Sequence, residues 1–130
     1  MNFNELRDYI VASGFLPEAT DKEDSTAKYE AIFLNDKPEE LDAEQFLVYT
    51  FKLRGGGIVK RYEVKLLVCS ASVAAGIELR NKIVEYLNFD GRPCPIAHFV
   101  KFALNDEDGF SFDQNTGYYT NALSFECLYL

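Results

Sequence analysis

Hydrophobic and polar residues alternate in two neighbouring runs near the middle of the chain, Glu44–Leu53 and Ile58–Cys69. In the second run every other residue from Tyr62 to Val68 is apolar, and the positions between are mostly charged. A period of two is typical of half-buried antiparallel strands. The glycines between the runs, residues 55–57, tolerate the positive φ angles of a tight reversal. The sequence therefore predicts a long β-hairpin.

Two other segments show the spacing of amphipathic helices. The first covers about Asn2 to Ser13, where Asn2 can cap the helix and Glu5 completes a capping box. The second follows Ser70 or Ser72, either of which can cap it, and continues to about Asn88. Its predicted buried stripe consists of Val73, Ile77, Val84 and Leu87, with Ile83 at the edge.

The remaining strands are shorter or lie near the C-terminal end. We predict them at Tyr29–Leu34, Ile96–Leu104, Phe110–Asp113 and Tyr118–Leu130. The rest of residues 16–44, a stretch with ten acids and three bases, is predicted to be loop. This order favours a single α+β domain over residues 1–130, with one mostly antiparallel sheet, two helices packed on one face and a long protruding β-hairpin. The other face of that sheet is expected to leave aromatic surface uncovered.

Composition narrows the classes of function. The chain has 130 residues, 48% of them hydrophobic, and a net charge of −8, so it suits one folded acidic domain. An acidic surface disfavours non-specific binding of nucleic acid. The N-terminus lacks a basic region followed by an apolar stretch, and no apolar run reaches the roughly 20 residues of a membrane span. We therefore expect a soluble protein made in a cytoplasm, with neither a membrane nor a specific nucleic acid as partner.

Positive charge is concentrated on the predicted hairpin, although the net charge of the whole chain is negative. Its bases are Lys52, Arg54, Lys60, Arg61 and Lys65, and Glu63 is the one acid among them. Such an element is typical of a docking surface. The alternative is a solvated hairpin whose charges keep a strand edge from aggregating.

Residues that could perform chemistry do not form a catalytic set. His98 is the only histidine, and we expect it on a strand among apolar neighbours as a satisfied or partly exposed side chain. Cys94 lies between two prolines and has little support as a nucleophile. The run from Asp106 to Gly109 resembles the start of a calcium loop, but Phe110 and Gly117 occupy the fifth and twelfth positions, so we expect an acidic turn. Gly57 precedes Ile58, which rules out a P-loop.

Two further groups of residues also have ordinary structural interpretations. The three cysteines, Cys69, Cys94 and Cys127, show no C-x-x-C spacing and are expected to be reduced core thiols. The aromatic residues near the basic hairpin fit core or interface positions better than stacking on nucleic acid; they are Phe46, Tyr49, Phe51 and Tyr62. We therefore expect no enzymatic activity, no catalytic residue, no cofactor and no bound metal.

Three segments of the chain resemble a known family. They are ELRDYIVAS at residues 5–13, YEVKLLVCSASVAAGIELRNKIVEYL at residues 62–87 and GYYTNALSFECLYL at residues 117–130. In residue type and order they are similar to the tail-terminator, or minor capsid, proteins of long-tailed bacteriophages and of prophages in Gram-positive bacteria. Residues 16–44 match that pattern least.

The resemblance implies a small α+β protomer that closes into a ring, usually a hexamer. Such a ring caps the head-proximal end of the tail tube and later joins it to the head–tail connector. Its expected partners are thus further copies of itself, the tail-tube protein and the connector. The resemblance also implies the candidate partner-binding residues: Lys52, Arg54, Arg61 and Lys65 would meet acidic surface on a neighbouring copy or on the tail tube. The protein would act in the virion tail and, before assembly, be found in the cytoplasm of the bacterial host. A monomeric accessory binding module without enzymatic activity is the alternative.

Overall fold

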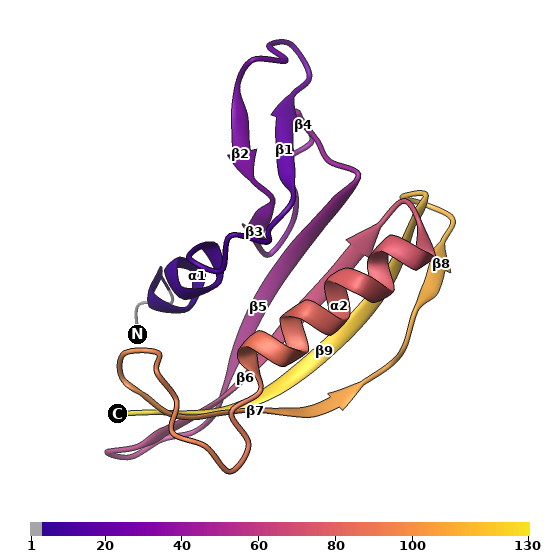
Figure 1. Ribbon diagram of the computed structural model, residues 1–130. Coiled ribbons are helices and arrows are strands. Elements are labelled where there is room, and N and C mark those ends of the chain that lie inside the picture. The colour runs from indigo at the N-terminus through magenta and orange to yellow at the C-terminus, as the bar shows by residue number, and fades with distance from the viewer. Residues whose placement is uncertain (1–3) are drawn as a thin grey trace.

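The computed structural model describes residues 4–130 of the chain. Its elements, in chain order, are α1 (Asn4–Val11), β1 (Glu18–Asp21), β2 (Lys28–Glu30), β3 (Ile32–Leu34), β4 (Leu41–Asp42), β5 (Gln45–Gly55), β6 (Lys60–Ser70), α2 (Val73–Leu87), β7 (Phe99–Glu107), β8 (Ser111–Asp113) and β9 (Tyr118–Tyr129). The predicted α+β class is confirmed (Figure 1). The predicted N-terminal cap Asn2 lies outside the described residues.

The main sheet has the strand order β3-β5-β6-β9-β7, and β8 pairs with β9 beyond the end of β7. All these pairs are antiparallel except β3 with β5, which is parallel. The predicted hairpin is present as β5 and β6. However, β9 pairs with β6 from Lys60 to Ser70, so the second strand of the hairpin lies inside the sheet along its whole length.

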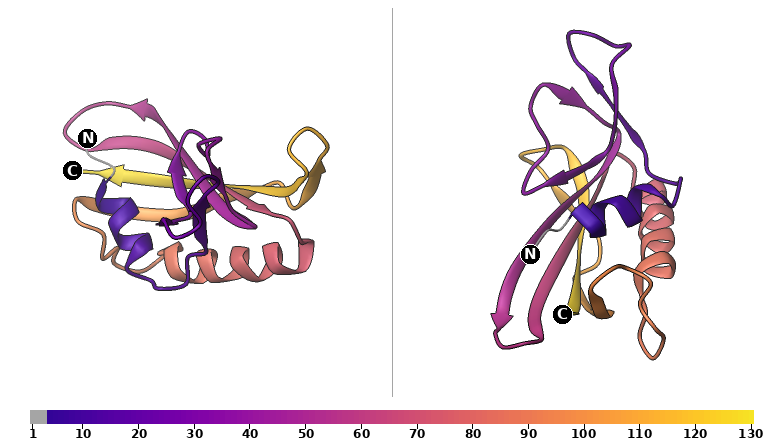
Figure 2. Two further views of the ribbon diagram at one scale, coloured as in Figure 1. Left: turned by 90° about the horizontal axis from the view of Figure 1, so that it is seen from above. Right: turned by 90° about the vertical axis from the view of Figure 1, so that its left-hand side faces the viewer.

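Both helices pack on one face of the main sheet, as predicted (Figure 2, left). The core between them combines Leu6 and Ile10 of α1, the inward side chains of α2, and the apolar residues of the central strands. Its largest fully buried side chains include Phe102, Phe125 and Leu66. Tyr86 of α2 donates a hydrogen bond from its hydroxyl to the Tyr9 carbonyl, 2.7 Å away, and the two rings stack at 4.7 Å. The helices are therefore tied to each other as well as to the sheet.

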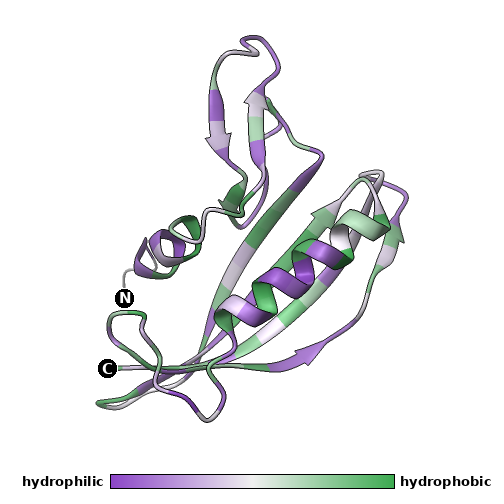
Figure 3. Ribbon diagram, in the orientation of Figure 1, coloured by the Kyte–Doolittle hydropathy of each residue, from purple (hydrophilic) through white to green (hydrophobic). Residues whose placement is uncertain are grey.

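The predicted buried stripe of α2 was largely wrong. Hydrophobic and hydrophilic stretches alternate along the helix (Figure 3), but the buried residues are Gly76, Leu79, Ile83 and Leu87. Val73 and Ile77 are instead 41% and 46% exposed. A Cβ on Gly76 would lie 2.9 Å from Cε1 of Phe110, so the missing side chain lets the helix turn this side inward. Of the two serines predicted as possible caps, Ser72 caps the helix by accepting a hydrogen bond from the Ala75 amide.

Residues 16–44, predicted to be mostly loop, form more structure than the sequence indicated. The predicted strand at Tyr29–Leu34 divides at the buried Ala31 into β2 and β3. β1 pairs with β2 and β4 to form a small second sheet, so the prediction of a single sheet was incomplete. We call β1, β2 and β4 with their connecting loops the acidic arm. Figure 1 shows it projecting from one end of the main sheet.

A second, smaller core attaches the acidic arm to the sheet face opposite the helices. It contains Ala19, Ala31, Leu41, Ala43, Phe46, Val48 and Cys69, with Phe33, Leu67 and Tyr118 packed against them. The ring of Tyr118 meets that of Phe46 edge-on at 5.1 Å, and its hydroxyl donates to the Ala43 carbonyl at 2.7 Å. The aromatic surface expected on this face is thus largely covered by the arm.

Candidate interaction surface

The part of the open sheet face that the arm leaves uncovered is charged. Antiparallel register places alternate residues of neighbouring strands on one face, and here Thr50 lies beside Lys65 and Lys52 beside Glu63. Across the next ladder Glu63 faces Glu126, and Arg61 faces Leu128, which neighbours Lys101 of β7. We call this surface the basic face; its cations are Lys52, Arg54, Arg61, Lys65 and Lys101.

All four candidate residues therefore lie on the same surface, and the structure adds Lys101. Sequence reasoning missed Lys101 because it comes from β7, which neighbours the hairpin only through β9. The acids of the basic face are Glu63, Glu126 and, at the margin on β7, Asp106. Cations outnumber acids here although the whole chain carries a net charge of −8. The surface is thus opposite in sign to the rest of the protein.

Two of the candidate residues already have partners on their own sheet. Arg54 donates from Nε to Oε2 of Glu63 at 3.0 Å, and this hydrogen bond lowers the pKa of the Glu63 carboxyl. Arg61 lies 3.8 Å from Glu126, which Lys101 also approaches to 3.4 Å. Among residues 4–130, no acid lies within ion-pair distance of Lys52 or Lys65, and both are exposed. Lys52 and Lys65 are therefore the charges most available to a partner.

The basic face ends at an open strand edge. β3 pairs with β5 only from Leu47 to Tyr49. From Lys52 to Gly55, no other strand of the described part of the chain runs along the outer side of β5. Free backbone groups on such an edge can pair with a strand of another chain.

The hairpin turn beside this edge exposes apolar side chains. Ile58 is 89% exposed, the highest value among the large hydrophobic residues described, and Leu53 is 53% exposed. Gly57 has a φ of 123°, a backbone angle that side-chain-bearing residues rarely adopt. The turn joins these apolar residues to Arg54 and Lys60 and contains no acid.

A groove of about 610 Å³ lies at the other end of the same sheet face, between the arm and the turn that joins β8 to β9. Its floor is apolar and is formed by Phe46, Val48, Leu67 and Cys69. Its rim carries the acids Asp36, Glu39, Asp42 and Asp113 and the bases Lys22 and Lys37.

Both rim lysines are engaged within the arm. Lys37 donates from Nζ to the Leu41 carbonyl at 2.6 Å and lies over the ring of Phe46, and Lys22 is 3.8 Å from Asp42. The groove therefore offers an apolar floor under a predominantly acidic rim, a surface that suits a basic and apolar segment.

The residues considered for chemistry occupy structural positions. His98 was predicted within a strand, but it lies just before β7 with a φ of 67°. It is exposed, and its Nδ1 is 2.9 Å from Oε1 of Glu5 on α1. Asp106 and Glu107, predicted to belong to a turn, are the last residues of β7 instead. Among residues 4–130 no three His, Cys, Asp or Glu side chains gather as they would around a metal ion.

The cysteines are free and mostly buried, as expected. Burial raises the pKa of the Cys69 thiol to about 12 and raises that of Cys127 as well. Cys94 is half-buried, and burial raises its pKa too. None of these thiols carries the lowered pKa of a reactive nucleophile.

The aromatic residues near the hairpin belong mainly to the core. Phe46, Tyr49 and Tyr62 are 6%, 5% and 8% exposed, while Phe51 is 40% exposed. Their burial agrees with the core interpretation and removes most of the ring surface on which bases could stack. Across residues 4–130 no helix has both the length and the apolar character needed to cross a membrane.

Comparison with protein-family models, with curated proteins and with solved structures gave no match to this chain.

Proposed function

We propose that the protein is a structural assembly protein of the tail-terminator class. In this role copies join into a ring, the ring caps the head-proximal end of a phage tail tube, and the capped tube is then joined to the head connector. The basic face is the observation that carries the proposal: a cluster of cations on one flat sheet surface of an otherwise acidic protein suits docking onto acidic protein surface.

The positions of the three segments that resemble the tail-terminator family support the same assembly role. Residues 5–13 contain most of α1, residues 62–87 contain most of β6 and all of α2, and residues 117–130 contain β9. These elements pack against one another around the main core. The segment that matches least, residues 16–44, contributes the acidic arm, which packs on the other sheet face.

Charge reversal on the basic face tests the proposal. Lys65→Glu changes an exposed side chain with no ion pair among residues 4–130, so it should leave the fold intact. Lys82→Glu is the matched control, because Lys82 is an exposed lysine on α2 whose pair with Glu78 is worth only a few tenths of a kcal/mol. Arg54 is less suitable, since its reversal would bring a second carboxylate to Glu63.

Assembly is measured by sedimentation velocity and negative-stain electron microscopy, with the protein alone and with tubes of the tail-tube protein. We expect the neighbouring genes to encode that tube protein and the connector. Wild type and Lys82→Glu should form rings on tube ends, and Lys65→Glu, or Lys52→Gln with Lys65→Glu, should not. Circular dichroism should report the same fold for every variant. If the double variant forms rings of normal stability, the basic face has no role in docking. A protein that never self-associates, even beside tubes, would contradict the proposed function.

A monomeric binding module is the second candidate, and the groove is the observation that favours it. That role predicts a saturable one-to-one complex with a peptide or small molecule and no ring. The same sedimentation experiment separates the two functions.

A further inference from the structure

The hairpin turn and the groove are complementary in shape and in charge. Residues 52–61 contain four bases and no acid, and the Ile58 side chain at the turn is 89% exposed. The groove offers an apolar floor and a rim on which acids outnumber bases. A projecting apolar side chain among cations is the counterpart of an apolar hollow surrounded by acids.

The turn of one copy cannot fill the groove of that same copy. Phe46, in the groove floor, and Gly55, at the turn, lie at opposite ends of β5. At about 3.4 Å per residue the strand between them spans roughly 30 Å. Figure 2 (right) shows the turn and the arm at opposite ends of the molecule. Any turn that enters the groove must therefore come from another chain.

We propose that the hairpin turn of one copy docks into the groove of the next, with Ile58 on the apolar floor and Lys60 facing Glu39 on the rim. The inference rests on the proposed function and names the contact through which its copies join. The second copy is the favoured occupant because this chain carries both halves of the contact and cannot close them internally.

The geometry of this contact also explains why copies would continue to add. The turn and the groove are different surfaces at different ends of the protomer, so the contact is head-to-tail and not two-fold symmetric. Each added copy leaves one turn and one groove open, and a constant rotation between copies closes the series into a ring. The glycines at residues 55–57 give the turn the backbone freedom to adjust to the groove.

A charge swap tests the contact. Lys60 and Glu39 are exposed, and neither has an ion-pair partner among the described residues. Lys60→Glu and Glu39→Lys should each weaken self-association about tenfold in sedimentation velocity, because each places like charges at every contact. The double variant restores opposite charges at every contact and should associate within about threefold of wild type. Glu85→Lys, an exposed change on α2 far from the groove, is the control for Glu39→Lys.

Cross-linking gives a readout that weak association does not obscure. In a Cys94→Ser background, chains with Ile58→Cys are mixed with chains carrying Glu39→Cys and treated with a short bis-maleimide. We expect cross-linked heterodimers from this mixture and none when Glu85→Cys replaces Glu39→Cys. Wild-type rings with neither cross-link nor sensitivity to the charge swap would overturn the contact while leaving the proposed function in place. Loss of tube capping with unchanged self-association would assign the groove to the tube protein and would also overturn the contact between copies. Complete absence of self-association would overturn both this contact and the proposed function.

Discussion

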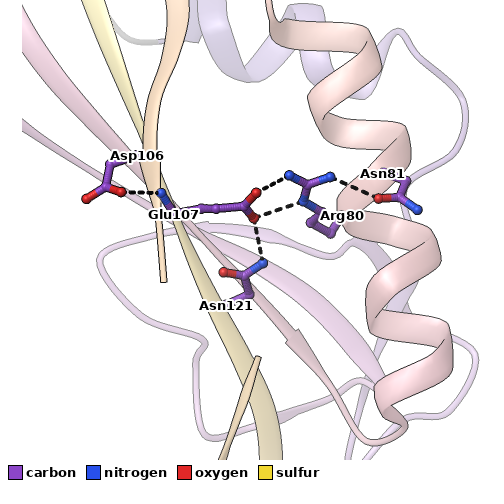
Figure 4. A network of polar contacts seen from close by, with 5 residues as sticks. All are labelled: Arg80, Asn81, Asp106, Glu107 and Asn121. Carbon is purple, nitrogen blue, oxygen red and sulfur yellow. Dashed lines mark hydrogen bonds and ion pairs between the residues drawn. The ribbon is translucent and has the colours of Figure 1, made fainter. Parts of the chain in front are cut away.

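The guanidinium of Arg80 on α2 makes a two-pronged contact with the carboxylate of Glu107 on β7, and its Nε lies 3.0 Å from Oε2 (Figure 4). Asn121, which is 2% exposed on β9, donates to the same oxygen at 3.2 Å. Arg80 also donates to Oδ1 of its neighbour Asn81 at 3.0 Å. This network joins the helix layer to β7 and β9.

Stability should depend on the ionisation of Glu107. The hydrogen bond from Arg80 holds the pKa of its carboxyl below the ordinary value of 4.5. A carboxyl with a lowered pKa in the folded state stabilises the fold above its unfolded pKa and loses that contribution as the pH falls through the folded pKa. We expect Glu107→Gln to reduce the free energy of unfolding by about 1 kcal/mol at pH 7 and by less at pH 3. Urea titrations at both pH values measure this, with Glu85→Gln as the surface control. Equal losses at both pH values would show that the charge is not involved.

Gly76 should resist substitution although it lies inside a helix. Alanine usually stabilises a helix interior by about 1 kcal/mol relative to glycine. Here the added Cβ would lie 2.9 Å from Cε1 of Phe110 and 3.1 Å from Cβ of Ser70, so we expect Gly76→Ala to lower the thermal midpoint instead. Gly76→Val should lower it further. Phe110→Ala in the Gly76→Ala background tests the cause: if the ring is the obstacle, the second change should cost less there than it does in wild type.

The acidic arm should loosen when Tyr118 loses its hydroxyl. Tyr118→Phe removes the hydrogen bond to the Ala43 carbonyl and leaves the ring contact with Phe46 in place. We expect a cost of about 1 kcal/mol, concentrated in the arm and not in the main core. Hydrogen exchange should speed up in β1 and β4 and stay unchanged in β6. Tyr119→Phe, on the adjacent position of β9, is the control. Uniform acceleration across both sheets would instead mean that the arm and the main core open together.

The thiols should differ in accessibility. Cys69 and Cys127 are buried with raised pKa values, so a thiol reagent at neutral pH should label only Cys94 in the folded protein, and slowly. In denaturant all three should react. Mass spectrometry after brief labelling with iodoacetamide counts the modified sites. Rapid labelling of Cys69 in the native state would show that the arm opens from the groove floor.

The hairpin and the second helix could be predicted from local pattern alone. The period of two in residues 58–69 and the cap at Ser72 are properties of adjacent residues, and both match β6 and α2 closely. The inward side of α2 could not be predicted in this way. It depends on the approach of Phe110 to Gly76, a contact between residues far apart in the chain.

The basic face, likewise, could be predicted only in part from local pattern. The alternation of β6 places Arg61 and Lys65 on one face, and the structure adds the neighbours that decide which charges remain available. Glu126 and Lys101 reach Arg61 only through the pairing of β9 with β6 and β7. The arm was missed because β1 and β4 have only four and two residues, too short for a period to be visible.

The position of β9 between β6 and β7 has a consequence for biosynthesis. A nascent chain that has emerged as far as residue 117 has made both flanking strands but lacks the one that joins them. Until residues 118–129 leave the ribosome, the backbone groups of β6 and β7 that pair with β9 have no partner and core side chains are exposed. Such a state is prone to aggregation. The sheet can therefore close only once β9 has emerged, so a nonsense mutation that removes residues 118–129 should be as damaging as one before β6.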